Sequence, residues 1–121
     1  MDEVSSHWPA AVTFVTPVAS RLPACGDLDT LAFRIPDHLR LRGLLRQLGR
    51  ALTATSANRG GSSPITSTKP LQKLLEGRDA YIVDDGDLPG GPPSTLVRWT
   101  AKGFEVIRCG RVPFAPVQER P

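Results

Sequence analysis

The stretch STLVRWTAKGFEVIR, residues 94–108, contains two runs rich in β-branched and aromatic residues. The first run ends at Thr100 and the second begins at Phe104, and the segment between them includes Gly103. Two such runs around a short glycine-bearing segment are typical of a β-hairpin. The sequence therefore predicts two antiparallel strands near the C-terminus, beside which the other strands must form a sheet.

Upstream of this hairpin the chain alternates between apolar runs and helical patterns. Leucines recur with helical spacing over residues 38–48, where Asp37 is placed as the N-cap and Gly49 as the C-terminal glycine. A second, shorter helix begins at Ser67 or Thr68. The remaining predicted strands are residues 10–15, 30–35, 51–55 and 80–83. This alternation predicts an α/β fold, with helices packed on a mixed sheet.

Length and composition bound the class of protein. With 121 residues, of which 40% are hydrophobic and 22% charged, the chain is expected to form one domain. A net charge of +3, carried mostly by arginine, favours either an anionic partner or a solvated basic face. Cys25 and Cys109 have no metal-binding or redox spacing and are expected to be free thiols. No signal peptide or membrane span is expected, which predicts a cytoplasmic protein without membrane contact.

Two glycine-bearing loops are candidate anion sites. The first places Thr55, Ser56 and Asn58 just before a Gly-Gly pair, and the second is residues 90–95. Hydroxyls and free backbone amides beside glycines form concave sites that bind anions. Neither loop matches a P-loop or a dinucleotide-binding fingerprint, so a nucleotide bound at these loops would be held in another way.

Arg34 and Arg108 fall near predicted strand ends and would add charge to these loops. Other chemistries have less support in the sequence. His7 and His38 are too few and too far apart to predict a metal site. A serine-hydrolase elbow is absent, and Asp84 stands in a common Asp-Gly turn rather than in a metal motif.

Taken together, the motifs resemble the YrdC-like domain of threonylcarbamoyl-adenylate synthases. They are, in chain order, WP at 8–9, LAFRIP at 31–36, TSAN at 55–58, DG at 85–86, PSTLV at 93–97 and IRCG at 107–110. The resemblance covers residues 8–112 and implies a YrdC-like twisted mixed sheet with flanking helices around a concave basic cleft. Residues 1–7 are expected to be loose, and residues 113–121 to form a disordered tail.

What the resemblance implies for function is nucleotidyl transfer. The family makes threonylcarbamoyl-AMP from ATP and N-carboxythreonine, itself formed from threonine and bicarbonate, and releases pyrophosphate. ATP is thus a substrate, accompanied by Mg²⁺, and the product feeds the threonylcarbamoyladenosine modification of tRNA. The expected partners are these small molecules and the downstream tRNA-modifying machinery, and the family's basic cleft has been associated with double-stranded RNA.

The resemblance also carries roles to individual residues. It implies that Ser56, Asn58 and Arg34 are catalytic. Thr13 falls on the threonine side, and no protein ligand for a metal is implied. The residues implied to bind ATP and its phosphates are Thr55, Ser56, Asn58, Ser94 and Arg108.

One family element has no counterpart in this sequence. The family carries a Lys-x-Arg-Pro stretch ahead of its Trp-Pro segment, whereas here the first lysine is Lys69 and seven residues precede Trp8. We therefore expect an N-terminally truncated domain in which lost cations weaken catalysis. Two alternatives stay open: a non-catalytic RNA- or nucleotide-binding remnant of the same fold, and carbamoyl-adenylate chemistry on another acceptor.

Overall fold

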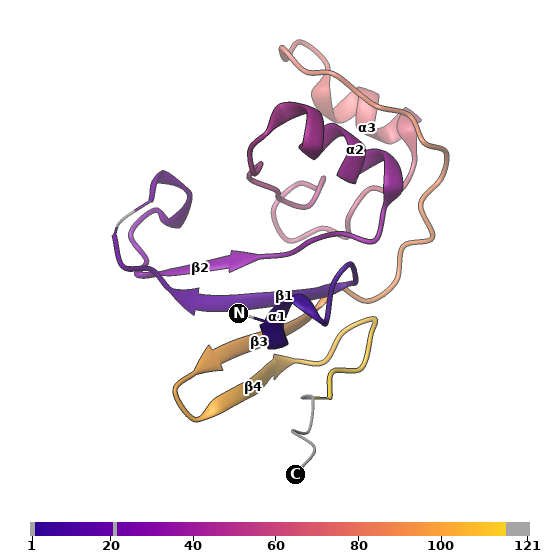
Figure 1. The fold of residues 1–121 in the computed structure, drawn as a ribbon. Coiled ribbons are helices and arrows are strands. Elements are labelled where there is room, and N and C mark those ends of the chain that lie inside the picture. The colour runs from indigo at the N-terminus through magenta and orange to yellow at the C-terminus, as the bar shows by residue number, and fades with distance from the viewer. Residues whose placement is uncertain (1, 21, 116–121) are drawn as a thin grey trace. The chain divides into compact units, whose positions relative to one another are not determined.

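The computed structural model describes residues 2–20 and 22–115 (Figure 1). Its elements are α1 (Asp2–Ser5), β1 (Val12–Pro17), the 3₁₀ helix η1 (Pro23–Cys25), β2 (Thr30–Phe33), α2 (Leu39–Leu48), α3 (Thr68–Leu75), β3 (Thr95–Thr100) and β4 (Gly103–Arg108). The chain divides into two compact units, residues 1–52 with 92–121 and residues 53–91. The first unit contains the strands and α2, and the second contains α3. Within the described ranges, no helix combines the length and apolar character needed to cross a membrane.

Four strands form one mixed sheet in the order β2-β1-β3-β4. β1 pairs antiparallel with β2 and parallel with β3, and β3 pairs antiparallel with β4. The predicted hairpin is confirmed: Thr100 lies opposite Gly103, whose φ of 108° is a conformation that glycine adopts without strain. The mixed sheet is therefore present, and its two central strands come from distant parts of the sequence.

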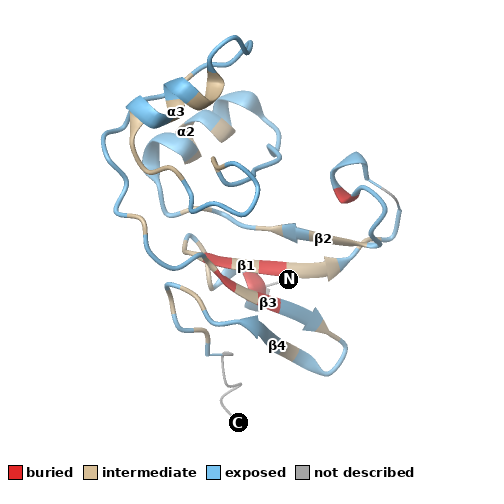
Figure 2. Cartoon of the chain, turned by 180° about the vertical axis from the view of Figure 1, so that it is seen from behind, coloured by how far each residue is buried: buried red, intermediate tan, exposed pale blue. Residues whose placement is uncertain are grey.

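One face of this sheet carries the core of the first unit. Val12 and Phe14 of β1 lie opposite Thr95 and Val97 of β3, and all four side chains are at most 2% exposed. Figure 2 shows the buried residues concentrated in these two strands. The rings around Phe14, with centroids 5.1 to 5.9 Å away, are those of Trp8, Phe104, Phe114 and His7. Aromatic rings thus contribute to the apolar contacts between the sheet and its flanking segments.

The two longer helices have the expected positions. α2 begins after His38, whose Nδ1 accepts a hydrogen bond of 3.2 Å from the Leu41 amide. The predicted N-cap, Asp37, is wrong by one residue, because His38 holds the extended backbone that lets its side chain reach the first turn. Gly49 ends the helix in the left-handed conformation, as predicted. In α3, Ser67 occupies the N-cap position without a side-chain cap bond.

Two predicted strands are wrong. Residues 51–55 and 80–83 have no strand conformation, and Tyr81 is 97% exposed. Their β-branched and small side chains favour extended backbone, but a strand also needs a hydrogen-bonded partner. Neither segment belongs to the four-stranded sheet. Both segments are loops, in the second unit or at its border.

The N-terminal segment and the start of the C-terminal tail also differ from expectation. Residues Asp2–Ser5, expected to be loose, form α1, and Val4 is buried in the aromatic core. Phe114, expected in a disordered tail, packs against the same core. Both are ordered because they cover apolar surface that the sheet alone leaves open. Residues 116–121 of the predicted tail lie outside the described residues.

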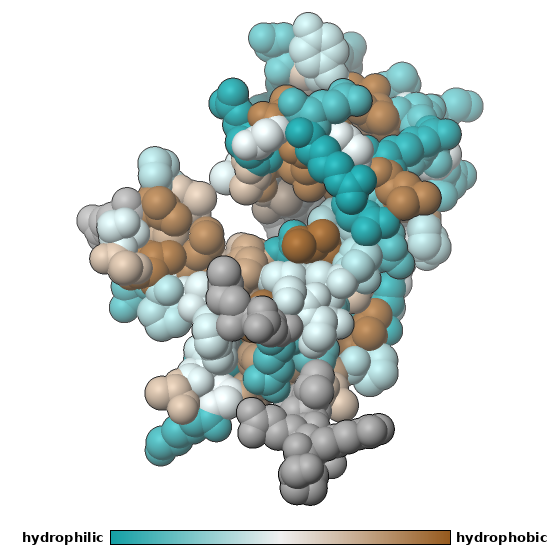
Figure 3. Space-filling view, in the orientation of Figure 1, coloured by the Kyte–Doolittle hydropathy of each residue, from teal (hydrophilic) through white to brown (hydrophobic). Residues whose placement is uncertain are grey.

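The loop around η1, between β1 and β2, has an apolar surface. Figure 3 shows brown side chains gathered over this loop, where Leu22 is 42% and Leu28 65% exposed. Beneath them Cys25 is buried, whereas Cys109, beyond β4, is exposed. Both cysteines are free thiols, as the spacing predicted.

Candidate functional site

Strand direction collects four of the predicted site residues at one end of the sheet. Because β1 and β3 run opposite to β2 and β4, the starts of the first pair lie beside the ends of the second. Thr13 is the second residue of β1 and Ser94 precedes β3. Arg34 directly follows β2, and Arg108 is the last residue of β4. The topology thus brings together residues separated by up to 95 positions in the sequence.

Three of these four residues are linked by hydrogen bonds. The hydroxyls of Thr13 and Ser94 lie 2.7 Å apart, and either can be the donor. Arg108 donates from Nη2 to the Ser94 carbonyl at 3.0 Å. This bond uses one of the five N–H donors of a guanidinium and fixes the direction of the side chain. A pair of hydroxyls beside an oriented cation is an arrangement suited to binding an oxyanion.

Arg34 faces an adjacent cleft of about 380 Å³ in the same unit. Among the described residues, the charged ones that line this cleft are Arg34, Asp37 and Arg111, and the others are Pro9, Ala10, Ala11, Pro36 and Val112. The sequence did not single out Arg111, although it directly follows the IRCG motif. Only the return of the chain beyond β4 to the start of β1 places it beside Arg34.

A buried threonine holds this end of the sheet together. Thr95 is 1% exposed; its hydroxyl donates to the Val112 carbonyl and accepts a 3.1 Å bond from the Gly110 amide. The Arg111 amide donates to the Pro93 carbonyl at 2.8 Å. A Cβ on Gly110 would overlap the backbone around residues 93–95, so only glycine permits this close approach. The segment after β4 is thereby bound to the start of β3.

The other predicted residues belong to the second unit. Ser56 donates from its hydroxyl to Asn58 Oδ1 at 2.6 Å, and Asn58 donates from Nδ2 to the carbonyls of Arg59 at 3.1 Å and Ser62 at 2.8 Å. Thr55 and Ser56 are exposed and Asn58 is half-buried. The side-chain amide of Asn58 thus stabilises the loop through hydrogen bonds within it, as expected for Asn in a turn. That these residues act together with Arg34 and Ser94 stays a prediction.

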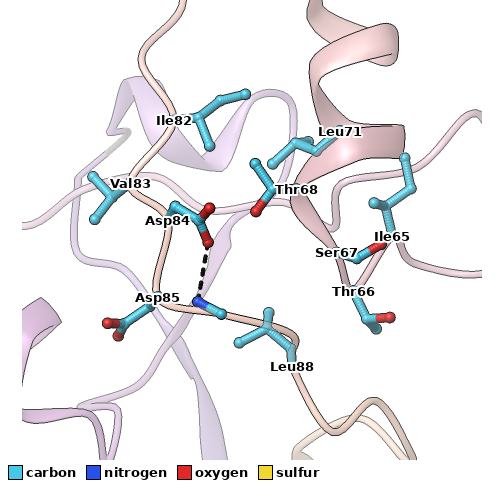
Figure 4. Close-up of a pocket in the computed structure, with 11 residues that line it drawn as sticks. Ile65, Thr66, Ser67, Thr68, Leu71, Ile82, Val83, Asp84, Asp85 and Leu88 are labelled. Atoms are coloured by element: carbon cyan, nitrogen blue, oxygen red, sulfur yellow. Dashed lines mark hydrogen bonds between the residues drawn. The ribbon is translucent and has the colours of Figure 1, made fainter.

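The second unit also has a small pocket of about 80 Å³ between the start of α3 and residues 82–88 (Figure 4). Asp84 accepts a 3.0 Å bond from the Gly86 amide, and the Thr68 hydroxyl points toward the same carboxylate. The Gly86 bond, with the Thr68 bond second, holds the pKa of Asp84 below its ordinary value of 3.8. This is the Asp-Gly turn expected from the sequence, and no group of three potential metal ligands occurs among the described residues.

Comparison with known proteins identifies the family. The Sua5/YciO/YrdC family model, described as telomere recombination, matches residues 1–110. A P. abyssi Sua5 structure in complex with L-threonine superposes with a TM-score of 0.77 at 29% identity, over 90% of this chain and 33% of that one. A doubly substituted form of P. abyssi Sua5 gives a TM-score of 0.81 at 30% identity, over 93% of this chain and 35% of that one. The fold and the family are thus established: the chain belongs to the Sua5/YciO/YrdC family.

Similar sequences carry a more specific name. The threonylcarbamoyl-AMP synthase of Pseudoalteromonas translucida is 31% identical over 96 residues, which cover 78% of this chain and 51% of that protein. The enzyme of the same name from Vibrio campbellii is 29% identical over 112 residues, covering 91% of this chain and 60% of that protein. The chain therefore spans between half and two thirds of the length of these relatives.

Proposed function

We propose that this chain acts in the synthesis of L-threonylcarbamoyladenylate from ATP and N-carboxythreonine. The observation that carries the proposal is the group of Thr13, Ser94 and Arg108 at the end of the sheet, with Arg34 in the adjoining cleft. The support from comparison is family membership, together with relatives named threonylcarbamoyl-AMP synthase and a Sua5 structure with L-threonine. Nucleotidyl transfer is a reaction whose barrier is lowered by fixed cations and oriented hydroxyl donors of this kind.

In that reaction the carboxylate of N-carboxythreonine attacks the α-phosphorus of ATP, and the bond to the leaving pyrophosphate breaks. Negative charge is then shared by the transferring phosphoryl group and the leaving group, so that fixed cations and oriented donors lower the barrier. Arg108 would supply a cation whose direction is fixed by the Ser94 carbonyl. The Thr13 and Ser94 hydroxyls would orient an oxygen of the threonine part or of the phosphate.

ATP would bring its own magnesium, as a substrate complex. The described residues contain no group of three His, Cys, Asp or Glu side chains that would hold the ion by themselves. A magnesium ion bound mainly through phosphates and waters fits such a site, because Mg²⁺ keeps several waters and needs few protein ligands.

The test is pyrophosphate release in the presence of ATP, threonine and bicarbonate, with identification of the product by mass. We expect release that depends on all three substrates and falls at least tenfold in Ser94→Ala, since a positioned hydroxyl is lost. Arg98→Ala serves as the matched control, because Arg98 pairs with the exposed Glu105 on the hairpin, outside the cleft and the group around Ser94. A product of another mass would indicate a different acceptor. If the chain neither binds ATP nor releases pyrophosphate, but retains RNA in a salt-dependent manner, the enzyme proposal is refuted and the RNA-binding alternative is favoured.

A further inference from the structure

Arg111 has no role in the group of residues that the sequence predicted, yet it lines a cleft of the first unit. The cleft has a volume of about 380 Å³, and Arg34 and Arg111 are the cationic side chains in the part of its lining that the structure describes; both are exposed. Its apolar wall consists of small residues and prolines such as Ala10 and Pro36, which leave room for a ligand. Its volume is enough for an anion of several heavy atoms.

The backbone at Arg111 is held on both sides. Its own amide donates to the Pro93 carbonyl at 2.8 Å. The preceding Gly110 and the following Val112 are both bound to the buried Thr95 hydroxyl. Because three successive residues are attached to the start of β3, the Arg111 side chain leaves from a fixed point. A ligand then needs to order only the side chain, which lowers the entropic cost of binding.

The charge balance of the cleft favours an anion. Among the described residues of the lining, Asp37 is the acidic one, and its Oδ1 lies 4.0 Å from Nη2 of Arg42, which partly offsets its charge. The described part of the lining thus contains two guanidinium groups and one carboxylate. Guanidinium groups bind phosphate oxygens in a bidentate manner, so two of them suit an anion with two linked phosphates.

We propose that Arg111 and Arg34 together bind the pyrophosphate part of the nucleotide, with Arg111 as a substrate-binding residue outside the predicted set. The assignment rests on the proposed nucleotidyl transfer. Arg111 would hold the leaving group while Arg108 and the hydroxyls of Thr13 and Ser94 face the reacting end. The two ends of the substrate would then be bound by neighbouring but separate groups of side chains.

Direct binding tests this site without any turnover. Inorganic pyrophosphate is titrated into the full chain by calorimetry at low ionic strength, with Arg111→Ala, Arg111→Lys, Arg34→Ala and the control Arg98→Ala. Each alanine variant lowers the net charge from +3 to +2, so a general charge effect is the same in all of them. We expect about a tenfold or larger loss of affinity in Arg111→Ala and Arg34→Ala, because charge-assisted bonds are lost. Arg111→Lys should lie between, since it keeps the charge without the planar fork.

The outcomes separate this site from the reaction. A loss of about tenfold or more in Arg111→Ala and Arg34→Ala, with a change of less than twofold in Arg98→Ala, supports the site, provided that circular dichroism shows every variant folded; an unchanged affinity in Arg111→Ala overturns it. Equal losses in Arg98→Ala and Arg111→Ala, or no binding by the unsubstituted chain at millimolar pyrophosphate, overturn it. If pyrophosphate binds with the expected pattern but no substrate is adenylated, the anion site stands and the proposed reaction fails.

Discussion

Replacing Thr95 by valine tests whether one hydroxyl binds the segment after β4 to the sheet. Valine has nearly the same shape as threonine, so the buried volume at this 1% exposed position is kept. The substitution removes the donor to the Val112 carbonyl and the acceptor for the Gly110 amide. Both backbone groups would lose their partner.

The expected cost follows from the number of groups left without a partner. A buried polar group that loses its partner costs about 1–3 kcal/mol. Two such groups are affected, but their surroundings are only partly buried, so water can satisfy some of the loss. We therefore expect the free energy of unfolding to fall by about 2–4 kcal/mol, which is a large share of the roughly 5–15 kcal/mol of a typical domain. Pyrophosphate affinity should fall as well, because Arg111 lies between the two affected residues.

The measurement is urea unfolding followed by the fluorescence of Trp8 and Trp99, the two tryptophans of the chain. Thr95→Ser is the matched control, since it keeps the hydroxyl and loses one methyl group, at about 1 kcal/mol. Valine should therefore be the more destabilising of the two. If Thr95→Val has the same free energy of unfolding as the unsubstituted chain while Thr95→Ser has a lower one, packing and not the hydroxyl holds the segment after β4 to the sheet.

Further predictions concern glycine, loop and carboxylate positions. Gly110→Ala should lower the free energy of unfolding by about 1–3 kcal/mol in the same urea assay, because the added Cβ overlaps backbone; an unchanged midpoint would contradict this close approach. Gly43→Ala should raise stability by about 0.5–1 kcal/mol, seen as a higher Tm, because an added Cβ meets nothing within 4 Å and alanine favours helix; a lower Tm would contradict it. Asn58→Ala should increase amide hydrogen exchange throughout its loop, since three side-chain hydrogen bonds are lost, and unchanged exchange would exclude that role. The pKa of Asp84 is lowered on folding, so its carboxylate stabilises the folded chain above pH 3.8, and this contribution is lost as the pH falls through the lowered pKa. Carboxyl NMR should show the pKa of Asp84 rising toward 3.8 when the chain is unfolded in urea. A pKa that does not change on unfolding would refute this prediction.

Local patterns determined the elements whose stability depends on neighbours in the sequence. The hairpin follows from two β-rich runs around Gly103, and α2 ends at Gly49 because glycine adopts the left-handed conformation there. The motif pattern also identified the family, which the comparisons confirm. For the hairpin and the end of α2, the deciding interactions lie within a few residues, so that propensity and spacing carry the information.

The tertiary structure decided which extended segments become strands and how the site is assembled. Residues 51–55 have a strand-like sequence but belong to no strand of the sheet, and local propensity carries no information about a partner. The bond between the Thr13 and Ser94 hydroxyls spans 81 positions and exists only because β1 and β3 pair in parallel. Arg111 is also placed by a long-range contact, because the neighbouring Gly110 lies close to the start of β3 and donates a hydrogen bond to Thr95. The sequence by itself supplied the candidate site residues, and long-range strand pairing determined which of them lie together.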